Sequence, residues 1–546
     1  MSNLFVRKAT GMVRSWSVFD AFVYAFFSIN LVTLGFYIFS QMYYFEGGLL
    51  PSILVSGFFL IFEIIVYASL IAVMPRSGGD YVWQTRIFGG GIGFILAITG
   101  WWFTLWTWVP LYGDMLRHIV ITPILGILGA TSTALWFGQT SLGLFVTTLI
   151  TLAIVTGIVV LGMKSYARIQ KWSFYGGMLG LAIVVVLLFT GSQAAFKAGL
   201  DKNATELFNA QPGVYDATVT AGTDAGAVTP LSGGSFNAIL LTLPYIVFFN
   251  LWPNWGATLY GEVRGATDYK RNFAGMAWAL GVTTLLGVLF FLGVNKTIGW
   301  DFYMQSNAAW WNFQWYGVES PLPVWPYPAL FAVFLTNSRL IQLVVILLMS
   351  LWWFGWAGTV FLSSSRVIFA AAFDRLLPEK AAELNERTGT PVNALLLMVI
   401  PSIIISYLFA YNTASFRSLT LFGTLVIAIM YFGTAIAAIF LPYVKKDLFN
   451  ASPIAQMKVA GIPLITVSGV IFAGFLGYLL FQWFLDPNAL FGIGYSINEA
   501  GLKNTTSLIL MAVLYGVAAA LYYGFKSYRK SKGIDLDKVT AEIPVE

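Results

Sequence analysis

The chain has 546 residues, of which 58% are hydrophobic and only 10% are charged, whereas an average soluble domain is about 25% charged. This composition excludes a water-soluble protein and favours one whose apolar surface faces lipid. The chain has no Cys and a single His, His118, which excludes disulfides, thiolate catalysis and metal sites built from Cys or clustered His. We therefore expect no metal and no other cofactor.

Long apolar runs predict a series of membrane helices along the chain. They lie at residues 18–40, 49–74, 89–113, 141–163, 172–191, 236–260, 273–295, 328–370, 391–410, 418–443, 461–484 and 506–526. Most exceed the roughly 20 residues needed to cross hydrocarbon. The sequence therefore predicts an all-α integral membrane protein with about twelve transmembrane helices. The eighth run is too long for one simple span, and we expect it to begin as a surface helix.

The positive charge is unevenly distributed. Most of the 30 Lys and Arg residues fall in the terminal segments and in the loops on the same side as the termini. Because positively charged loops stay in the cytoplasm, we expect both termini there, in a multi-pass protein of the plasma membrane surrounded by lipid. These residues are spread over many loops, so nucleic acid is not an expected partner. The sequence leaves the oligomeric state open.

Two long loops lie on the opposite, outer side of this prediction, at residues 192–235 and 296–327. The second is crowded with Trp residues, which suit a membrane–water boundary. These rings are consistent with an interfacial cap and also with a lid over a solute path.

Three motifs resemble the amino acid–polyamine–organocation (APC) transporter superfamily. After the second helix, residues 74–83 read Met-Pro-Arg-Ser-Gly-Gly-Asp-Tyr-Val-Trp, similar to the family's Pro-Arg-Ser-Gly-Gly-Glu-Tyr signature. After the eighth helix, the chain carries three short segments in the same order as the family. They are Ser365-Arg366, Asp374-Arg375-Leu376-Leu377-Pro378 and Gly389-Thr390-Pro391-Val392-Asn393-Ala394. In the sixth, Phe248-Phe249-Asn250-Leu251-Trp252 leads to Glu262-Val263-Arg264 and Lys270-Arg271-Asn272, as in a third family segment.

The resemblance implies a 5+5 inverted-repeat (LeuT-like) fold with broken helices 1 and 6 and two extra helices. The repeats would occupy residues 18–191 and 236–443, separated by an extracellular loop at 192–235. The extra helices would lie in 444–526, between cytoplasmic ends at 1–17 and 527–546. A helix broken inside a membrane frees backbone N–H and C=O groups, which are tolerated where they face protein, water or solute.

The sequence of the sixth helix itself indicates a break. Pro253 lies within the run, beside Asn250, Asn254 and Gly256, and Pro cannot donate the helical hydrogen bond. The alternative is a kink whose free groups bond to neighbouring helices. By the resemblance, Phe248 corresponds to the aromatic residue that closes over the substrate in relatives.

The first helix departs from the family pattern. Relatives carry a Gly-x-Gly stretch where this chain has Leu31, Val32 and Thr33, with Ser28 and Asn30 nearby. The expected substrate-binding residues are Ser28, Asn30, Thr33, Phe248, Phe249, Asn250, Trp252 and Asn254. Because of this departure, the sequence is also consistent with an amine, a polyamine or a nucleobase as the substrate, in place of an amino acid. Ser28 and Asn30 are equally suited to bonding neighbouring helices.

Three residues are candidates for coupling to an ion, H⁺ or Na⁺. Glu63 lies midway along the second helix, where an ionised carboxylate costs a few kcal/mol. It is either a proton-coupling residue or a neutral Glu bonded to a helix carbonyl. Proton-coupled relatives carry a Lys where this chain has Gly177, and sodium-coupled relatives use hydroxyls of the eighth helix, where Thr359 and Ser363 lie.

Charged residues at the cytoplasmic side are candidate gates. Arg76 and Asp80 near Glu262 and Arg264 would form an ion-pair network, or they serve only as positive-inside anchors. There is no phosphate-binding Gly-x-x-x-x-Gly-Lys-Ser/Thr loop. We therefore expect a secondary transporter, not an enzyme, that moves an amino acid or related small organic solute by alternating access. A membrane sensor without transport is a weaker alternative.

Overall fold

Membrane-spanning helices make up most of this computed structural model, which describes residues 1–546 except 1–10, 13, 413–421, 485–504 and 544–546. Among the described residues, 12 helical segments are long and apolar enough to cross a membrane. In chain order these spans 1 to 12 cover Val18–Ser40, Leu49–Val73, Gly90–Ile127, Ser141–Val160, Met163–Thr190, Phe236–Glu262, Tyr269–Thr297, Arg339–Phe373, Val392–Ala410, Gly423–Val444, Leu464–Phe484 and Ser507–Ser531. The prediction of an all-α integral membrane protein is confirmed.

Eight spans consist of one regular helix each. They are α3 (Leu49–Val73), α9 (Ser141–Val160), α10 (Met163–Thr190), α14 (Tyr269–Thr297), α19 (Val392–Ala410), α21 (Phe422–Val444), α23 (Leu464–Phe484) and α24 (Thr505–Ser531). The remaining four spans, 1, 3, 6 and 8, are interrupted. Short elements connect the spans: α4 (Asp80–Phe88), α8 (Thr131–Gln139), α11 (Gln193–Phe208), α12 (Val214–Asp224), α15 (Trp300–Tyr316), α16 (Pro328–Val333), η6 (Glu379–Ala382), α22 (Lys446–Asn450), β1 (Lys458–Val459), β2 (Ile462–Pro463) and α25 (Leu536–Ala541).

Three of the interrupted spans change helix type along their length, and the fourth, span 8, is divided by a turn between two α-helices. Span 1 consists of α1 (Val18–Ile29), the π-helix η1 (Leu31–Gly35) and α2 (Phe36–Ser40), and span 6 of α13 (Phe236–Asn250) and the 3₁₀-helix η5 (Pro253–Glu262). Span 3 consists of α5 (Gly90–Ile98), η2 (Thr99–Phe103), η3 (Thr104–Thr107), α6 (Val109–Leu116), η4 (Arg117–Ile121) and α7 (Thr122–Ile127), and span 8 of α17 (Arg339–Trp356) and α18 (Thr359–Phe373).

Two predicted boundaries were wrong. Span 3 continues to Ile127, because its π and 3₁₀ turns carry the helix through Arg117 and His118. Span 5 begins at Met163 rather than at 172. Its first turns carry Lys and Arg side chains, which lie at the membrane boundary and do not interrupt the helix. The glycine before it, Gly162, has φ 84°, a conformation that permits the sharp turn from α9.

The long eighth run divides as expected, although at other places. The short helix α16 precedes the span, and the span itself is interrupted between Trp356 and Thr359. The predicted start of the tenth helix, 418–421, lies outside the described residues.

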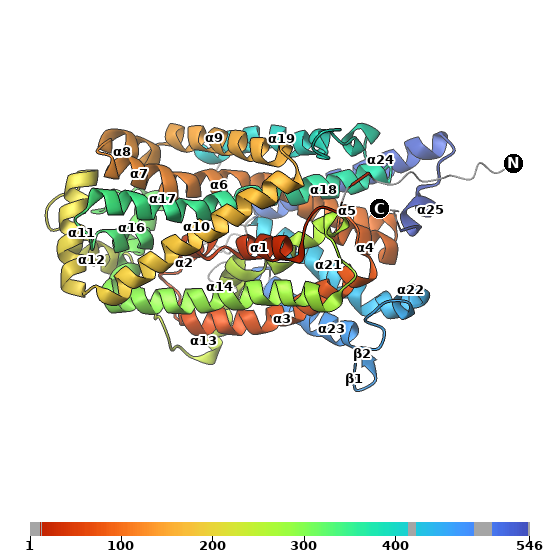
Figure 1. Ribbon diagram of the computed structural model, residues 1–546, viewed down its shortest axis with the longest axis horizontal. Helices are drawn as coiled ribbons and strands as arrows, with labels where there is room; N and C mark the ends of the chain where they lie inside the picture. The colour runs from red at the N-terminus through yellow and green to blue at the C-terminus, as the bar shows by residue number, and fades with distance from the viewer. Residues whose placement is uncertain (1–10, 13, 413–421, 485–504, 544–546) are drawn as a thin grey trace.

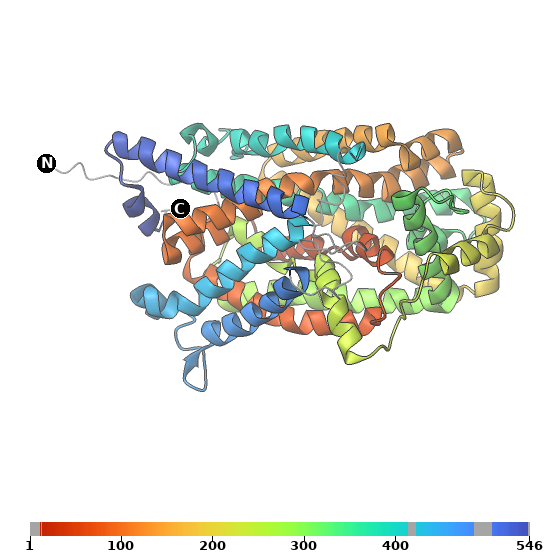
Figure 2. The same cartoon turned by 180° about the vertical axis from the view of Figure 1, so that it is seen from behind.

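The two ends of the helix bundle differ, as Figures 1 and 2 show. The described residues nearest the two chain ends lie at one end of the bundle, called here the termini end, together with α22, the β1–β2 hairpin and α25. Helices α11, α12 and α16 lie at the opposite end, called here the loop end. Helix α15 packs on α12 and therefore belongs to the loop end.

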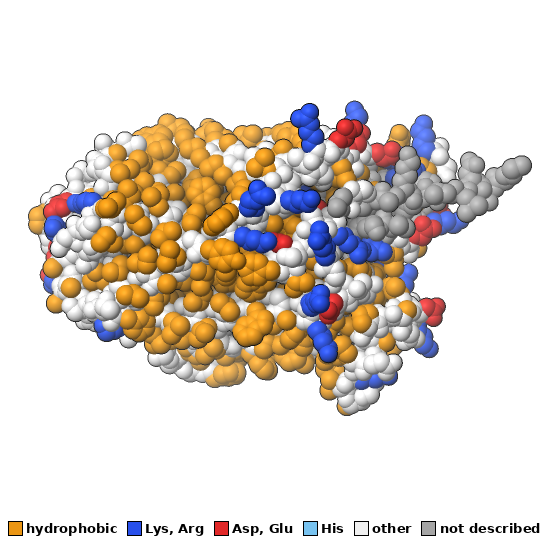
Figure 3. All heavy atoms as spheres, viewed as in Figure 1, with side chains coloured by type: hydrophobic (Ala, Val, Ile, Leu, Met, Phe, Trp, Pro, Cys, Tyr) orange, Lys and Arg blue, Asp and Glu red, His pale blue; other side chains and the backbone are white. Residues whose placement is uncertain are grey.

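Burial distinguishes central spans from peripheral ones. In the most apolar window of span 1, 94% of the residues are buried, against 17% in span 12. On the outside, large apolar side chains such as Phe58, Trp172 and Leu285 are more than half exposed. Hydrophobic side chains also cover most of the middle of the face drawn in Figure 3, which suits contact with lipid. Span 1 therefore lies at the centre of the bundle, and the site is built around it.

Candidate functional site

Span 1 is interrupted at Asn30. This residue has φ 44°, in the left-handed region that Asn tolerates better than most residues. Its Oδ1 accepts a hydrogen bond from the backbone N–H of Thr33 at 2.8 Å, and its Nδ2 donates to the carbonyl of Trp352 at 3.0 Å. The side chain thus caps the second half of span 1 and ties the interruption to span 8. Ser28 donates to the carbonyl of Tyr24 at 2.8 Å.

Span 6 is interrupted directly before Pro253, as the sequence predicted. Helix α13 ends at Asn250, whose Oδ1 accepts a hydrogen bond from Ser56 at 2.9 Å. Asn254 accepts one from the hydroxyl of Tyr431 at 3.0 Å. The Nδ2 groups of both Asn residues are buried and have no hydrogen-bond partner among the described residues. The interruption therefore leaves two buried amide donors available.

The two interruptions pack against each other. The ring of Phe249 lies against Gly35, and a Cβ added to Gly35 would be only 3.0 Å from that ring. The ring centre of Phe249 lies 4.9 Å from that of Phe39. Further along, Gly256 faces the ring of Tyr24. The absence of a side chain on Gly35 lets the spans approach this closely, whereas a Cβ at Gly256 would be in ordinary contact with Tyr24.

A cavity of about 400 Å³ lies beside these interruptions, toward the loop end. Its lining residues come from spans 1, 3, 4, 6, 8 and 9 and from α15: Leu34, Tyr37, Ile38, Gln41, Trp108, Leu111, Tyr112, Asp114, Met115, Arg117, Leu144, Phe248, Trp311, Gln314, Trp315, Tyr316, Trp356, Phe409 and Asn412. Trp315 is 41% exposed and Tyr316 75% exposed. The cavity therefore reaches the surface at α15, and its volume falls within the range typical of small-molecule sites.

Of the predicted substrate-binding residues, only Phe248 lines this cavity. Trp252 lies directly behind the wall, with its ring centre 5.0 Å from that of Trp108. The others, Ser28, Asn30, Thr33, Phe249, Asn250 and Asn254, are buried around the two interruptions. The Oγ1 atom of Thr33 has no hydrogen-bond partner among the described residues.

The charged residues of the cavity wall are Asp114 and Arg117, which the sequence analysis did not select. Arg117 Nη2 lies 2.6 Å from Asp114 Oδ1, and the hydroxyl of Tyr37 donates to Asp114 Oδ2 at 2.6 Å. A carboxylate and an arginine three residues apart on one helix face can pair. The spacing of three residues between Asp114 and Arg117, inside an apolar run, was the feature of the sequence from which this pair could have been predicted.

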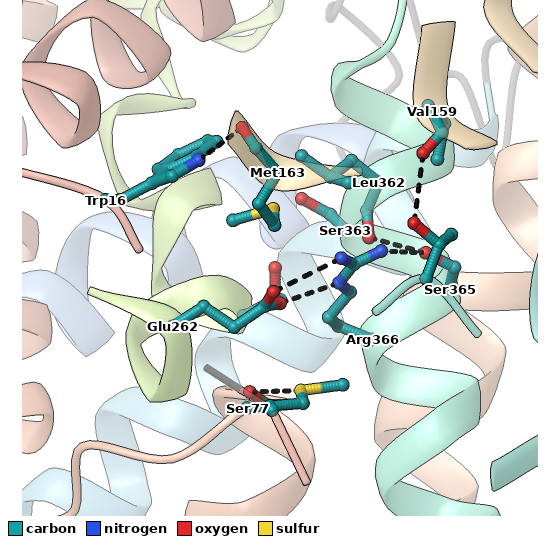
Figure 4. Close-up of polar contacts among 12 residues, drawn as sticks. Trp16, Ser77, Val159, Met163, Glu262, Leu362, Ser363, Ser365 and Arg366 are labelled. Atoms are coloured by element: carbon teal, nitrogen blue, oxygen red, sulfur yellow. Dashed lines mark hydrogen bonds and ion pairs between the residues drawn. The ribbon is translucent and has the colours of Figure 1, made fainter. Parts of the chain in front are cut away.

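The termini end is closed by a second group of contacts (Figure 4). Arg366 in α18 donates from Nε to Glu262 Oε1 at 2.9 Å, and both side chains are buried. Residues 15 and 16 lie across Glu262: both backbone N–H groups donate to its carbonyl. The indole of Trp16 donates to the carbonyl of Met163 at 2.9 Å. Spans 1, 5, 6 and 8 are thereby joined at this end.

Asp80, another predicted gate residue, is bonded to residues outside this closure. Asp80 accepts hydrogen bonds from Tyr67, Trp101 and Thr434, at 2.6, 2.9 and 2.6 Å. Burial raises the pKa of Asp80 above its usual value, and these hydrogen bonds oppose that effect. Arg76 donates to the carbonyl of Pro75. The structure thus brings Glu262 to Arg366, a residue that the sequence reasoning missed as its partner.

Comparison with known proteins agrees with this architecture. The sequence profile described as amino acid permease matches residues 18–519, most of the chain. The chain belongs to the amino acid permease family, within the APC superfamily. This family consists of transporters rather than enzymes, and the chain is a multi-pass membrane protein. A search of curated proteins found no match.

In this permease, the two sodium candidates meet the first span. The hydroxyl of Tyr24 lies 2.7 Å from Ser363 Oγ and donates to the carbonyl of Thr359 at 2.8 Å. Ser363 Oγ also donates to the carbonyl of Trp255 at 3.2 Å, and Thr359 Oγ1 donates to the carbonyl of Trp356 at 2.9 Å. The hydroxyl of Tyr24 therefore lies between Ser363 Oγ and the carbonyl of Thr359.

The proton candidate Glu63 is fully buried in α3. Neither carboxylate oxygen has a hydrogen-bond partner among the described residues. Tyr67, one helical turn further along the same helix, donates to Asp80, and Tyr431 and Asp80 lie within electrostatic range of Glu63. An ionised carboxylate without a partner is costly in such a place.

Proposed function

We propose that this permease is a secondary active transporter that carries a small organic solute, an amino acid in the first place, by alternating access. One observation carries the proposal: a cavity beside two facing helix interruptions reaches the surface at one end and is sealed at the other. Freed backbone groups at interrupted helices are a means of binding polar solutes inside a membrane.

The seal at the termini end has the features of a gate. Its contacts join spans 1, 5, 6 and 8 through a few side chains and two backbone hydrogen bonds. Breaking them would open a path between spans 1 and 6 from the other end. Closure at the loop end would then require α15 to move over the cavity, with Phe248 and Trp315 on its opposite walls.

We also propose that both termini face the cytoplasm and that the permease resides in the plasma membrane. Lys and Arg side chains gather toward the termini end on the face in Figure 3, whereas the middle is apolar. Positively charged residues are retained on the cytoplasmic side of membranes. On this orientation the cavity opens to the outside of the cell.

For the coupling ion we propose H⁺ rather than Na⁺. Glu63 can gain and lose a proton without a competing hydrogen bond, whereas Thr359 and Ser363 are already bonded to Tyr24. A buried carboxylate within a membrane helix suits proton coupling.

The direct test is uptake by the purified full-length permease in proteoliposomes. An inward pH gradient is imposed, and radiolabelled amino acids, amines and nucleobases are supplied in turn. We expect at least one amino acid to accumulate above the protein-free control. Absence of flux and of counterflow for every solute would contradict the transporter proposal. A thermal-shift screen of the same compounds reports binding independently, because a ligand of the native state stabilises it.

A further inference from the structure

The cavity wall carries no net charge among its described residues. Asp114 and Arg117 are its charged members, and they neutralise each other. Asp114 Oδ1 receives Arg117 Nε at 2.7 Å and Nη2 at 2.6 Å, and the nitrogen Nε2 of His118 lies 3.5 Å away. Tyr37 takes the other oxygen at 2.6 Å. Neither a carboxylate nor a guanidinium is left over to balance a net charge on a solute.

Aromatic rings form most of the rest of the wall, and their neighbours hold them in place. Tyr112 and Trp356 are stacked with ring centres 3.5 Å apart and 8° between their planes. Trp311 meets the ring of Tyr37 edge to face at 5.4 Å. Trp108 is supported by Trp252, at 5.0 Å. Rings fixed in this way form an apolar pocket before the solute arrives, which limits the entropy lost on binding.

We propose that the solute is a zwitterionic amino acid with a large apolar or aromatic side chain. This inference rests on the proposed function, and it names the solute class of the same cavity. A zwitterion has no net charge, and its ammonium and carboxylate groups can lie antiparallel to the Asp114–Arg117 pair. The large side chain then meets the rings of Trp108, Trp311 and Trp356, in a cavity of about 400 Å³ that a small side chain would leave unfilled.

Charge disfavours the other solute classes. A polyamine or choline would place a cation near Arg117 with no unpaired carboxylate to offset it, and glutamate would place an extra anion near Asp114. The aromatic walls alone would suit a cation, but the neutralised pair opposes one. A nucleobase is flat and neutral, yet it lacks the opposite charges that match the pair.

The test is competition against radiolabelled phenylalanine for binding and counterflow with the full-length permease. We expect tryptophan and leucine to compete at least about tenfold better than alanine, lysine, glutamate, putrescine, choline or adenine. Alanine, a cation, an anion or adenine competing as well as tryptophan would overturn the proposed class while leaving the transporter proposal intact. If no compound binds or exchanges, both proposals fail.

Two variants locate the site. Trp356→Leu keeps an apolar side chain but removes the stacked ring, and we expect phenylalanine to bind about tenfold more weakly. Trp172→Leu is the control, because Trp172 is 71% exposed on the outside of α10 and its loss should leave binding unchanged. Melting temperatures of both variants show whether they fold. A folded Trp356→Leu permease that binds phenylalanine like the wild type would also overturn the inference.

Discussion

The guanidinium of Arg366 makes a two-point contact with the carboxylate of Glu262, with Nε 2.9 Å from Oε1 and Nη2 3.4 Å from Oε2. The two residues are 104 positions apart in the chain. Their contact joins the last turn of η5 to the middle of α18, and both side chains are almost completely buried.

Glu262→Gln should therefore destabilise the permease strongly. Removing one partner of a buried ion pair leaves the other charge uncompensated, at a cost of about 3–5 kcal/mol. Thermal unfolding in detergent measures the loss. Glu379→Gln provides the comparison, because Glu379 forms its ion pair with Arg529 at 2.9 Å but is 62% exposed, and such pairs contribute about 1 kcal/mol or less. Equal effects of the two changes would contradict the assignment.

The same substitution should loosen the closure at the termini end. The chain has no Cys, so a single Thr258→Cys variant gives one labelling site. Thr258 is fully buried near the interrupted span, and we expect slow maleimide labelling from the termini side. Adding Glu262→Gln should accelerate labelling at least about tenfold, the change produced by 1.4 kcal/mol in an opening equilibrium. Unchanged labelling would show that the pair does not hold the gate.

Asn30 should not tolerate replacement by smaller residues without loss of stability. Asn30→Ala removes the cap on Thr33 and the bond to Trp352, and it places Ala in the left-handed region. We expect a loss of about 2–4 kcal/mol, from the cap, the buried hydrogen bond and the backbone strain together. Asn30→Gly relieves the strain and should lose less. A lower melting temperature for the Gly variant than for the Ala variant would be inconsistent with strain at this position.

Because of Tyr24, we expect sodium to change neither the melting temperature nor the uptake rate of the permease. Its hydroxyl bonds both to Ser363 and to the carbonyl of Thr359, so these groups are not free to ligate a cation. We expect the melting temperature and the uptake rate to be the same in sodium and potassium chloride at equal ionic strength. Stabilisation by sodium alone would indicate a bound ion and would contradict this prediction.

Glu63→Gln should separate coupling from transport. Gln resembles neutral Glu in shape but cannot release a proton, and Glu63 has no bonded partner among the described residues. We expect the variant to lose accumulation driven by a pH gradient while it still exchanges preloaded solute. Glu206→Gln, at an exposed position that pairs with Arg339, should keep both activities. Unchanged pH dependence in Glu63→Gln would remove this residue from the coupling mechanism.

Helix-weakening residues around Pro253 located the interruption of span 6, whereas the interruption of span 1, which lies at Asn30, was expected from the family resemblance. The π and 3₁₀ turns of span 3 were not predicted, since an apolar run has the same appearance whether its hydrogen bonds reach three, four or five residues back. Contacts between distant positions were also missed. Arg366 and Glu262 each stand in a family motif, but pairing them requires the packing of spans 6 and 8.

The cavity illustrates the same limit. Its Trp residues in α15 were visible as an aromatic loop segment, but both a cap and a lid were consistent with them. Only the fold places Trp311 beside Tyr37 and Trp356 beside Tyr112. Side-chain composition indicated what kind of surface the loop would offer, whereas the partner of each ring depends on the relative rotation of whole helices.

The helix of the last span, α24, is bonded to the loop that follows span 8. Arg529 in α24 donates to the carbonyl of Arg375 and pairs with Glu379, both beyond the end of span 8. Arg86, in α4 just before span 3, donates to the carbonyl of Glu542 and pairs with Asp374 in the same loop after span 8. A bulky fusion partner attached at the carboxyl terminus would thus load this junction mechanically, and fluorescent reporters or immobilisation tags there should slow turnover even when the protein folds well.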